Sequence, residues 1–438
     1  MSTLVRGARV IDPHAGIDAR VDILISSDGV TLDPVRVFPG VREVDARGLW
    51  ALPGFVDLQV HFREPGQTHK EDLATGSRAA LAGGVTTVVV MPNTRPVLDD
   101  PALVRAQHAI AEARGLAHVL VAAAATQGSE GRAVSDYRAL KGAGAVAVTD
   151  DGLPVLDDDV MRAALVSCAA NDLLFMQHAE DTRVTRHVPM TTCDVSRAAG
   201  VEGQPPEAES RIVERDVDLA RELGARYHVL HLSTQASLEA VRRAKAAGAR
   251  VTCEASPHHL LLTHDDVVAR GVDTPKSARD LDPNKKMNPP LRSGADRRAL
   301  VSGIVDGSVD AVATDHAPHA ADEKGAGFVK APFGVTGLET MFAALLTFVH
   351  DGTIDARRAV ELVTAGPARV LGRAGQVGTL AGPRAPPDVT LVDPARAWTV
   401  GDATLASRSH NSCFIGRTFK GRVTATFIRG FLAYQVVS

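Results

Sequence analysis

Two kinds of segment alternate along the middle of the chain. Valine-rich runs that are apolar on both faces alternate with segments rich in alanine, arginine and glutamate. Strands that alternate with helices predict parallel βαβ units, and strands apolar on both faces predict burial on both sides. Eight strand segments are found: GFVDLQVHF, TTVVVMPNT, HVLVAAAAT, AVAVTDDG, LLFMQHAED, YHVLHLS, RVTCEASPHH and DAVATDHAPH. The helices expected between them include 70–82, 101–114, 159–170, 207–223, 235–247 and 295–306. The pattern predicts an α/β fold, a (β/α)8 TIM barrel.

The two ends of the chain differ from the middle. The first fifty residues predict short strands with turns (TLVRGARVID, VDILISSDG, VREVDARGLWALPG), and the same style returns near the other end (DVTLVDP, RVTATFIRGFLAY). We therefore expect one small β domain, formed from both termini, beside the barrel. The predicted division is 1–52 for its N-terminal part, 53–368 for the catalytic barrel and 369–438 for its C-terminal part.

Two stretches within the barrel region are predicted to be long loops, 182–206 and 264–293. The second contains an unusual insertion, PKSARDLDPNKK, just before MNPPLR. Loops of such length in a compact domain tend to be functional, so we expect them near the mouth of the barrel.

Composition narrows the classes of function. A net charge of -4 and 4% aromatic residues give no reason to expect nucleic acid or an anionic membrane as a partner. No apolar run approaches the roughly 18 residues of a spanning helix, and no signal peptide is expected from the first residues. The four cysteines are scattered without a CxxC pair, which argues against a disulfide framework or a thiolate zinc site. A reduced, cytoplasmic location is the expectation.

Chemically reactive side chains gather where the predicted strands end. In a (β/α)8 barrel the carboxyl ends of the strands converge on one face, where active sites lie. Five of the eight strands end in a side chain that can bind a metal, and all of these offer imidazole nitrogen or carboxylate oxygen. That ligand set suits zinc or a similar divalent ion with positions open for water. The residues at strand ends are His61 with Arg63, Asn93, Asp150 with Asp151, His178, His231, and Asp315 with His319.

Eight motifs carry a resemblance to a known family. DLQVHFREPG, MPNT, VTDDG, QHAED, HLST, NPPLR, ATDHAPH and APFG resemble, in order, the dihydroorotase family of the amidohydrolase superfamily. The likeness is greatest to the bacterial class I branch in which an aspartate bridges two metals, and it runs from LPGFVDL to GRVTATFIRG. It implies a cytoplasmic zinc hydrolase of pyrimidine biosynthesis. The reaction would be the reversible cyclisation of N-carbamoyl-L-aspartate to L-dihydroorotate.

The resemblance also implies a ligand set. His61 would bind one metal together with Asp151 and Asp315, and Asp151 would bridge to a second metal. His178 and His231 would hold that second metal. Asp315 would also be the catalytic residue that moves a proton.

The substrate-binding residues implied by the resemblance are Arg63, Asn93, Asn288 and His319, with the backbone near Phe333 and Gly334 over the substrate ring. The chemistry of these side chains agrees. A guanidinium forms two parallel hydrogen bonds with a carboxylate, and the substrate carries a free carboxylate. An asparagine amide both donates and accepts, as an amide-bearing substrate requires.

Position 59 departs from the family pattern. The family's first motif is His-x-His, but this chain has Gln59-Val60-His61. A glutamine oxygen is a poor zinc ligand compared with imidazole. We therefore expect one tight zinc ion, at Asp151, His178 and His231, and a second ion that is weak or absent.

Three explanations of Gln59 stay open: an enzyme with one tight and one loose metal, an impaired scaffold partner of aspartate transcarbamoylase, or an engineered or sequencing change. Because the other expected groups are all present, retained dihydroorotase activity is favoured. A third function, allantoinase or hydantoinase, ranks lower because those relatives usually carry a carboxylated lysine on the fourth strand, which is absent here.

Several other residues receive less specific predictions. A homo-oligomer is expected. Asp57 is expected to orient its neighbours, and His187 to be a surface or structural residue. For His258 and His259, support of the metal ligands and simple packing are weighed equally.

Overall fold

The computed structural model describes residues 2–37 and 39–436. Its centre is an eight-stranded parallel sheet in the order β15-β14-β13-β10-β9-β8-β7-β6. The sheet closes on itself because Val60 pairs with His316 and the His61 N–H donates to the His316 carbonyl at 2.8 Å. The predicted barrel is confirmed, and it closes at the strand end that carries His61. The strands are β6 (Phe55–Val60), β7 (Val85–Val90), β8 (His118–Ala124), β9 (Ala145–Thr149), β10 (Leu174–Gln177), β13 (Arg226–Val229), β14 (Val251–Ala255) and β15 (Ala311–Val312).

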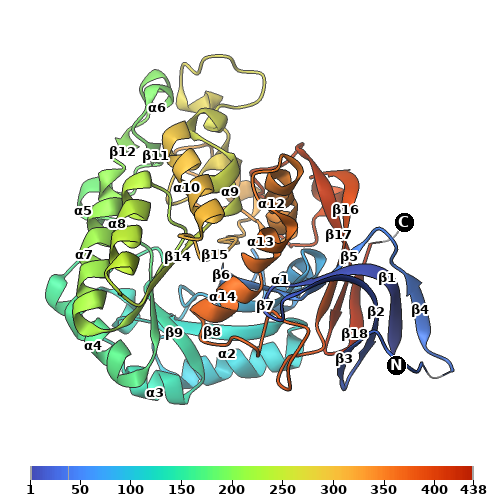
Figure 1. The fold of residues 1–438 in the computed structure, drawn as a ribbon. Coiled ribbons are helices and arrows are strands. Elements are labelled where there is room, and N and C mark those ends of the chain that lie inside the picture. Colours follow the sequence, from blue (N-terminus) through green and yellow to red (C-terminus); the bar gives the residue numbers. More distant parts are fainter. Residues whose placement is uncertain (1, 38, 437–438) are drawn as a thin grey trace.

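Helices surround this sheet (Figure 1). Helix α2 (Pro101–Arg114) has a favourable start. The Asp100 side chain accepts a hydrogen bond from the Ala102 N–H, and Pro101 occupies the first helical position. Helix α7 (Glu207–Leu223) buries Ile212, Val213 and Val217, which lie on one face at helical spacing. The larger helices are α1 (Leu73–Ala82), α2 (Pro101–Arg114), α3 (Tyr137–Gly142), α4 (Asp158–Asn171), α7 (Glu207–Leu223), α8 (Gln235–Ala246), α10 (Gly294–Asp306), α12 (Met341–His350), α13 (Ala356–Glu361) and α14 (Ala365–Val370).

A second sheet joins the two ends of the chain. Its order is β18-β17-β16-β5-β1-β2-β3, with β4 beside β1. The antiparallel pair of β5 and β16, in which Ala51 lies opposite Leu391, connects the two ends. Figure 1 shows the blue N-terminal and red C-terminal strands side by side. The strands are β1 (Thr3–Asp12), β2 (Ile17–Ser26), β3 (Gly29–Leu32), β4 (Arg42–Asp45), β5 (Trp50–Pro53), β16 (Val389–Thr399), β17 (Thr418–Ile428) and β18 (Phe431–Gln435).

This terminal sheet confirms a small β unit formed from both ends of the chain, while the division at 1–52, 53–368 and 369–438 stays a prediction. Within the described residues, no helix combines the length and the apolarity that crossing a membrane requires.

The two predicted long loops contain short elements of their own. Segment 182–206 holds α5 (Thr182–Thr185), β11 (Met190–Thr191), α6 (Asp194–Ala198) and β12 (Gly203–Gln204). Segment 264–293 follows α9 (Pro257–Leu261) and holds the 3-10 turns η2 (His264–Val267), η3 (Ala278–Asp280) and η4 (Pro283–Lys285). Both segments lie at the same end of the barrel (Figure 1). The remaining short helices are η1 (Gln127–Ser129), α11 (Ala321–Lys324), η5 (Leu338–Thr340) and η6 (Asp402–Thr404).

Candidate metal centre and substrate cavity

A cavity of about 190 Å³ lies where the barrel strands end. Apart from Gln59, which lies beneath it, every residue predicted to bind metal or substrate lines this cavity. Gly152, His187 and Ala317 also line it, and sequence reasoning had set His187 aside. The lining residues are His61, Arg63, Asn93, Asp151, Gly152, His178, His187, His231, Asn288, Asp315, Ala317, His319, Phe333 and Gly334.

One half of the cavity wall is a complete ligand cluster. The ligating atoms of Asp151, His178 and His231 lie within 4.8 Å of one another, and all three residues are buried. His178 Nδ1 is 2.9 Å from His231 Nε2, and Asp151 Oδ1 is 3.9 Å and 3.8 Å from these two atoms. One carboxylate and two imidazoles converging on a point fit a divalent cation such as Zn²⁺. Burial acts to raise the pKa of the Asp151 carboxyl, but His231 and His61 hold that pKa well below its usual range.

The other half contains His61, Asp315 and Gln59. His61 Nε2 lies 3.2 Å from Asp151 Oδ2 and 3.2 Å from Asp315 Oδ1. Burial lowers the pKa of His61, but these two carboxylates outweigh that effect and raise it to about 9. This half therefore attracts positive charge, as a cation-binding position does.

Gln59 has an amide donor where a ligand is expected. Its Nε2 donates to Asp151 Oδ1 at 3.1 Å, and its Oε1 is buried without a hydrogen-bond partner. An amide N–H offers no lone pair to a metal ion, so Gln59 in this orientation is not a ligand. Its strand, β6, directs the side chain to the predicted place, but its chemistry differs from that of imidazole.

Glu180 supports the complete half, and sequence reasoning missed it. Its Oε2 lies 3.0 Å from His178 Nε2 and accepts a hydrogen bond from Asn288 Nδ2 at 2.7 Å. A carboxylate on the far nitrogen fixes the tautomer of a ligating histidine, which leaves Nδ1 free for the metal. The signal in the sequence was the two-residue spacing of His178 and Glu180 in QHAED.

Arg63 and His319 form the opposite wall. Burial lowers the pKa of Arg63 to about 10, so its guanidinium stays charged at neutral pH. Burial, and then the cations Arg63, Lys70 and Lys324, lower the pKa of His319 to about 2, so its imidazole is neutral. Lys70 Nζ lies 3.4 Å from His319 Nδ1, which is therefore the acceptor, and Nε2–H donates to the Phe333 carbonyl at 2.8 Å.

Four non-glycine residues that line the cavity have left-handed backbone, among them His187 with a φ of 56°. The other three φ angles are 59° at Arg63, 30° at His231 and 49° at Asp315. Such angles are uncommon outside glycine and tend to collect at functional sites. Because β6 ends at Val60, strand alternation does not reach Arg63. The left-handed turn at Arg63, and not the pleat of a strand, brings its side chain to the wall.

Residues outside the lining have supporting positions. Asp57 is fully buried and accepts hydrogen bonds from the Thr314 N–H at 3.1 Å and the Thr314 hydroxyl at 2.5 Å. It thereby ties the first barrel strand to the segment that carries Asp315. His258 and His259 are buried but do not line the cavity.

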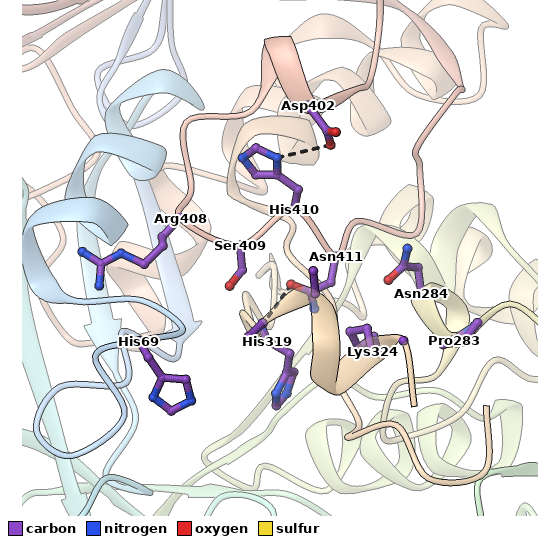
Figure 2. Close-up of a pocket in the computed structure, with 13 residues that line it drawn as sticks. His69, Pro283, Asn284, His319, Lys324, Asp402, Arg408, Ser409, His410 and Asn411 are labelled. Carbon is purple, nitrogen blue, oxygen red and sulfur yellow. Dashed lines mark hydrogen bonds and ion pairs between the residues drawn. The ribbon is translucent and has the colours of Figure 1, made fainter. Parts of the chain in front are cut away.

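A larger cavity of about 580 Å³ lies beside the first and shares His319 with it. Figure 2 shows His319 near Lys324 and Asn411 on its floor. Two of its side chains have acidic partners, since His410 lies 3.2 Å from Asp402 and Arg408 lies 2.5 Å from Asp72.

The fold is that of solved cyclic amidohydrolases. The chain is similar to L-hydantoinase (dihydropyrimidinase) from Arthrobacter aurescens, with a TM-score of 0.86 and 24% identity over 100% of this chain and 97% of that one. It is also similar to dihydropyrimidinase from Brevibacillus agri, with a TM-score of 0.84 and 22% identity over 99% and 95% of the two chains. At such identities the likeness shows the fold alone. The fold and the ligand cluster together define a (β/α)8-barrel protein with a candidate metal site.

Comparison of sequences identifies the family within this class. Residues 48–237 match a family model described as Dihydro-orotase-like. A protein named Dihydroorotase from Anaeromyxobacter dehalogenans is 44% identical over 433 residues, 98% of this chain and 97% of the relative. Another of that name, from Citrifermentans bemidjiense, is 42% identical over 444 residues, 99% of this chain and 100% of the relative. The chain belongs to the dihydroorotase family, which confirms the resemblance seen in the motifs.

Proposed function

We propose that this chain is a metal-dependent dihydroorotase, which interconverts N-carbamoyl-L-aspartate and L-dihydroorotate in pyrimidine biosynthesis. One observation carries the choice of substrate: the Arg63 guanidinium lies on the same small cavity as Asp151, His178 and His231. Dihydroorotate bears a carboxylate on its ring, and a buried guanidinium is the matching partner. Hydantoin and dihydropyrimidine rings offer no such carboxylate.

The residues of the chain divide the work of the reaction. A metal bound at the ligand cluster supplies Lewis acidity and an activated water. Arg63 holds the substrate carboxylate, while the amides of Asn93 and Asn288 donate to and accept from its imide groups. Asp315 takes the proton of the attacking water and delivers it to the leaving ring nitrogen, as a general base and then a general acid.

The cofactor in this proposal is zinc, with one tight ion per chain at Asp151, His178 and His231. The second ion is weak or absent because Gln59, which stands in place of a histidine, donates its amide N–H to Asp151 Oδ1 and offers no lone pair to a metal. A single ion beside Asp315 retains the groups that the reaction uses, so activity is kept.

The test is an assay of the purified chain with L-dihydroorotate, allantoin and hydantoin, before and after removal of metal by a chelator. We expect turnover of dihydroorotate alone, lost on chelation and restored by Zn²⁺. Turnover of hydantoin or allantoin in preference to dihydroorotate would overturn the choice of substrate.

A second candidate follows from Gln59: a catalytically impaired scaffold that binds aspartate transcarbamoylase, the enzyme that makes N-carbamoyl-L-aspartate. Sustained metal-dependent turnover by the chain alone would exclude the scaffold-only function. We also propose a homo-oligomer located in the cytoplasm. Light scattering of the purified chain, alone and with the transcarbamoylase, tests both kinds of assembly.

A further inference from the structure

Two buried lysines lie behind the substrate cavity, and no proposed step uses them. Lys286 and Lys324 are 4% and 5% exposed. Among the described residues, neither Nζ has a carboxylate oxygen within 4.0 Å. Burial lowers the pKa of Lys286 to about 8 and that of Lys324, which also faces Lys286, to about 7. A buried ammonium without a counter-ion is costly, so its hydrogen bonds must offset that cost.

Both ammonium groups bind carbonyls of one loop, residues 328–335. Lys286 Nζ donates to the Val329 carbonyl at 2.8 Å and to the Ala331 carbonyl at 2.6 Å. It also lies 4.5 Å from the centre of the Phe333 ring, a cation–π contact. One lysine thus holds the first half of the loop and the ring of Phe333, a residue that lines the cavity.

Lys324 holds the second half. Its Nζ donates to the Gly334 carbonyl at 2.9 Å, the Pro332 carbonyl at 3.1 Å and the Lys286 carbonyl at 3.3 Å. The Gly334 N–H also donates to the Lys286 carbonyl at 3.0 Å. The loop is therefore fastened to the backbone of Lys286, two residues before Asn288.

The loop also lies tightly against the segment after β15 that carries Asp315. Gly334 has a φ of 120°, and a Cβ there would come within 2.5 Å of the Ala317 Cβ. Asn411 donates to the Gly334 carbonyl at 3.1 Å from the opposite side. The position of the loop is thus set by polar contacts from behind and by close packing in front.

We propose that Lys286 and Lys324 are positioning residues, which lock the 328–335 loop onto the segment carrying Asn288 and thereby fix the shape of the substrate cavity. The inference rests on the proposed function only in taking dihydroorotate as the ligand. Both lysines act on substrate binding through the position of the loop, and neither acts on the metal.

The experiment compares Lys324→Met and Lys286→Met, which keep the long side chain and remove the ammonium, with Lys330→Met. Lys330 is exposed on the same loop and serves as the matched control. Loss of the Lys286 ammonium leaves the Val329 and Ala331 carbonyls without a donor, and loss of the Lys324 ammonium leaves the Pro332 carbonyl without one. We therefore expect KM for dihydroorotate to rise by about 10-fold or more. We expect kcat to change less, zinc content to stay the same, and Lys330→Met to keep the wild-type KM.

Trypsin provides a readout that does not depend on activity. Cleavage after Lys330 should become about 10-fold faster or more in Lys324→Met and Lys286→Met, because the loop is released. The fragments are identified by mass, and Lys330→Met, which lacks the cleavage site, confirms the assignment.

Two results would overturn the proposal: unchanged cleavage after Lys330, or faster cleavage with an unchanged KM. Lys324→Gln, which keeps two N–H donors without the charge, should recover part of both losses. If neither KM nor resistance to trypsin recovers, hydrogen bonds to the loop carbonyls are not the cause of the losses. An inactive wild-type chain would instead count against the proposed function, so the two failures are distinguishable.

Discussion

The two halves of the metal centre are built from the same barrel, yet only one is complete. Asp151, His178 and His231 bring three ligating atoms within 4.8 Å, whereas on the other side Gln59 supplies an amide donor beside His61 and Asp315. The strand that carries Gln59 is as well packed as its neighbours. The comparison teaches that one ligand can differ while the strand that carries it stays packed in the barrel.

Removal of a ligand from the complete half should have the largest effect. His178→Ala takes one of three ligands away, and we expect kcat/KM to fall by more than about 100-fold, since even the loss of a supporting group costs 10–100-fold. Metal content, measured by mass spectrometry, should fall from about one ion per chain to near zero. His350→Ala, an exposed histidine on α12, is the control and should keep both values. A variant that retained its ion would contradict this assignment.

Completion of the incomplete half should raise metal content. Gln59→His restores an imidazole next to His61, and we expect a second tight ion, with an affinity for it up to about 100-fold higher. Gln59→Leu is the matched control, because it removes the amide without adding a ligand and should not gain an ion. If wild type and Gln59→His carry two tight ions and have equal activity, the weak site does not exist.

Loss of support on the complete half should have a smaller effect. Glu180→Gln keeps the size of the side chain but replaces the carboxylate beside His178 Nε2. We expect zinc affinity to fall by about 10-fold, measured by competition with a coloured chelator. Glu222→Gln, on the surface beside Arg162, is the control. If wild type, Glu180→Gln and Glu222→Gln bind zinc with equal affinity, Glu180 does not support the metal centre.

Asp57→Asn should have the smallest effect on the centre, because Asp57 contacts no ligand atom and binds Thr314 from below. We expect the free energy of unfolding to fall by about 1–3 kcal/mol, with metal content unchanged. Burial raises the pKa of Asp57 to about 7, so the folded protein holds a proton that the unfolded chain releases near pH 4. The stability from this group therefore falls as pH rises from about 4 through 7. Denaturant titrations at pH 5 and pH 8 should show this slope in wild type and lose it in Asp57→Asn.

Hydrophobic pattern alone predicted the frame of the molecule. Two predicted helices have the bounds observed for α2 and α7, and all eight barrel strands are present. The last strand is shorter than its sequence suggested, since β15 ends at Val312 and the chain then leaves the sheet. That departure carries Asp315 and His319 to the cavity, and no periodicity describes it.

Contacts between side chains far apart in the sequence could not be predicted from the sequence. The ligand cluster was predicted because strand ends converge, and the oddity of Gln59 was visible because its neighbours matched a family motif. The direction of its amide depends on Asp151, 92 positions away. The hydrogen bond of Lys324 with the Lys286 carbonyl likewise forms only once α11 meets the 264–293 segment.

The pairing of β5 with β16 has a consequence for synthesis on the ribosome. Strands β1 to β5 emerge first, but the partner of β5 begins only at Val389. At a synthesis rate of about 5–20 residues per second, the edge of β5 stays unpaired for roughly 20 to 70 s. During that interval an unpaired strand edge is open to association with other nascent chains, a hazard that chaperones counter. The nascent barrel, whose first strand also pairs with His316, remains open for nearly as long.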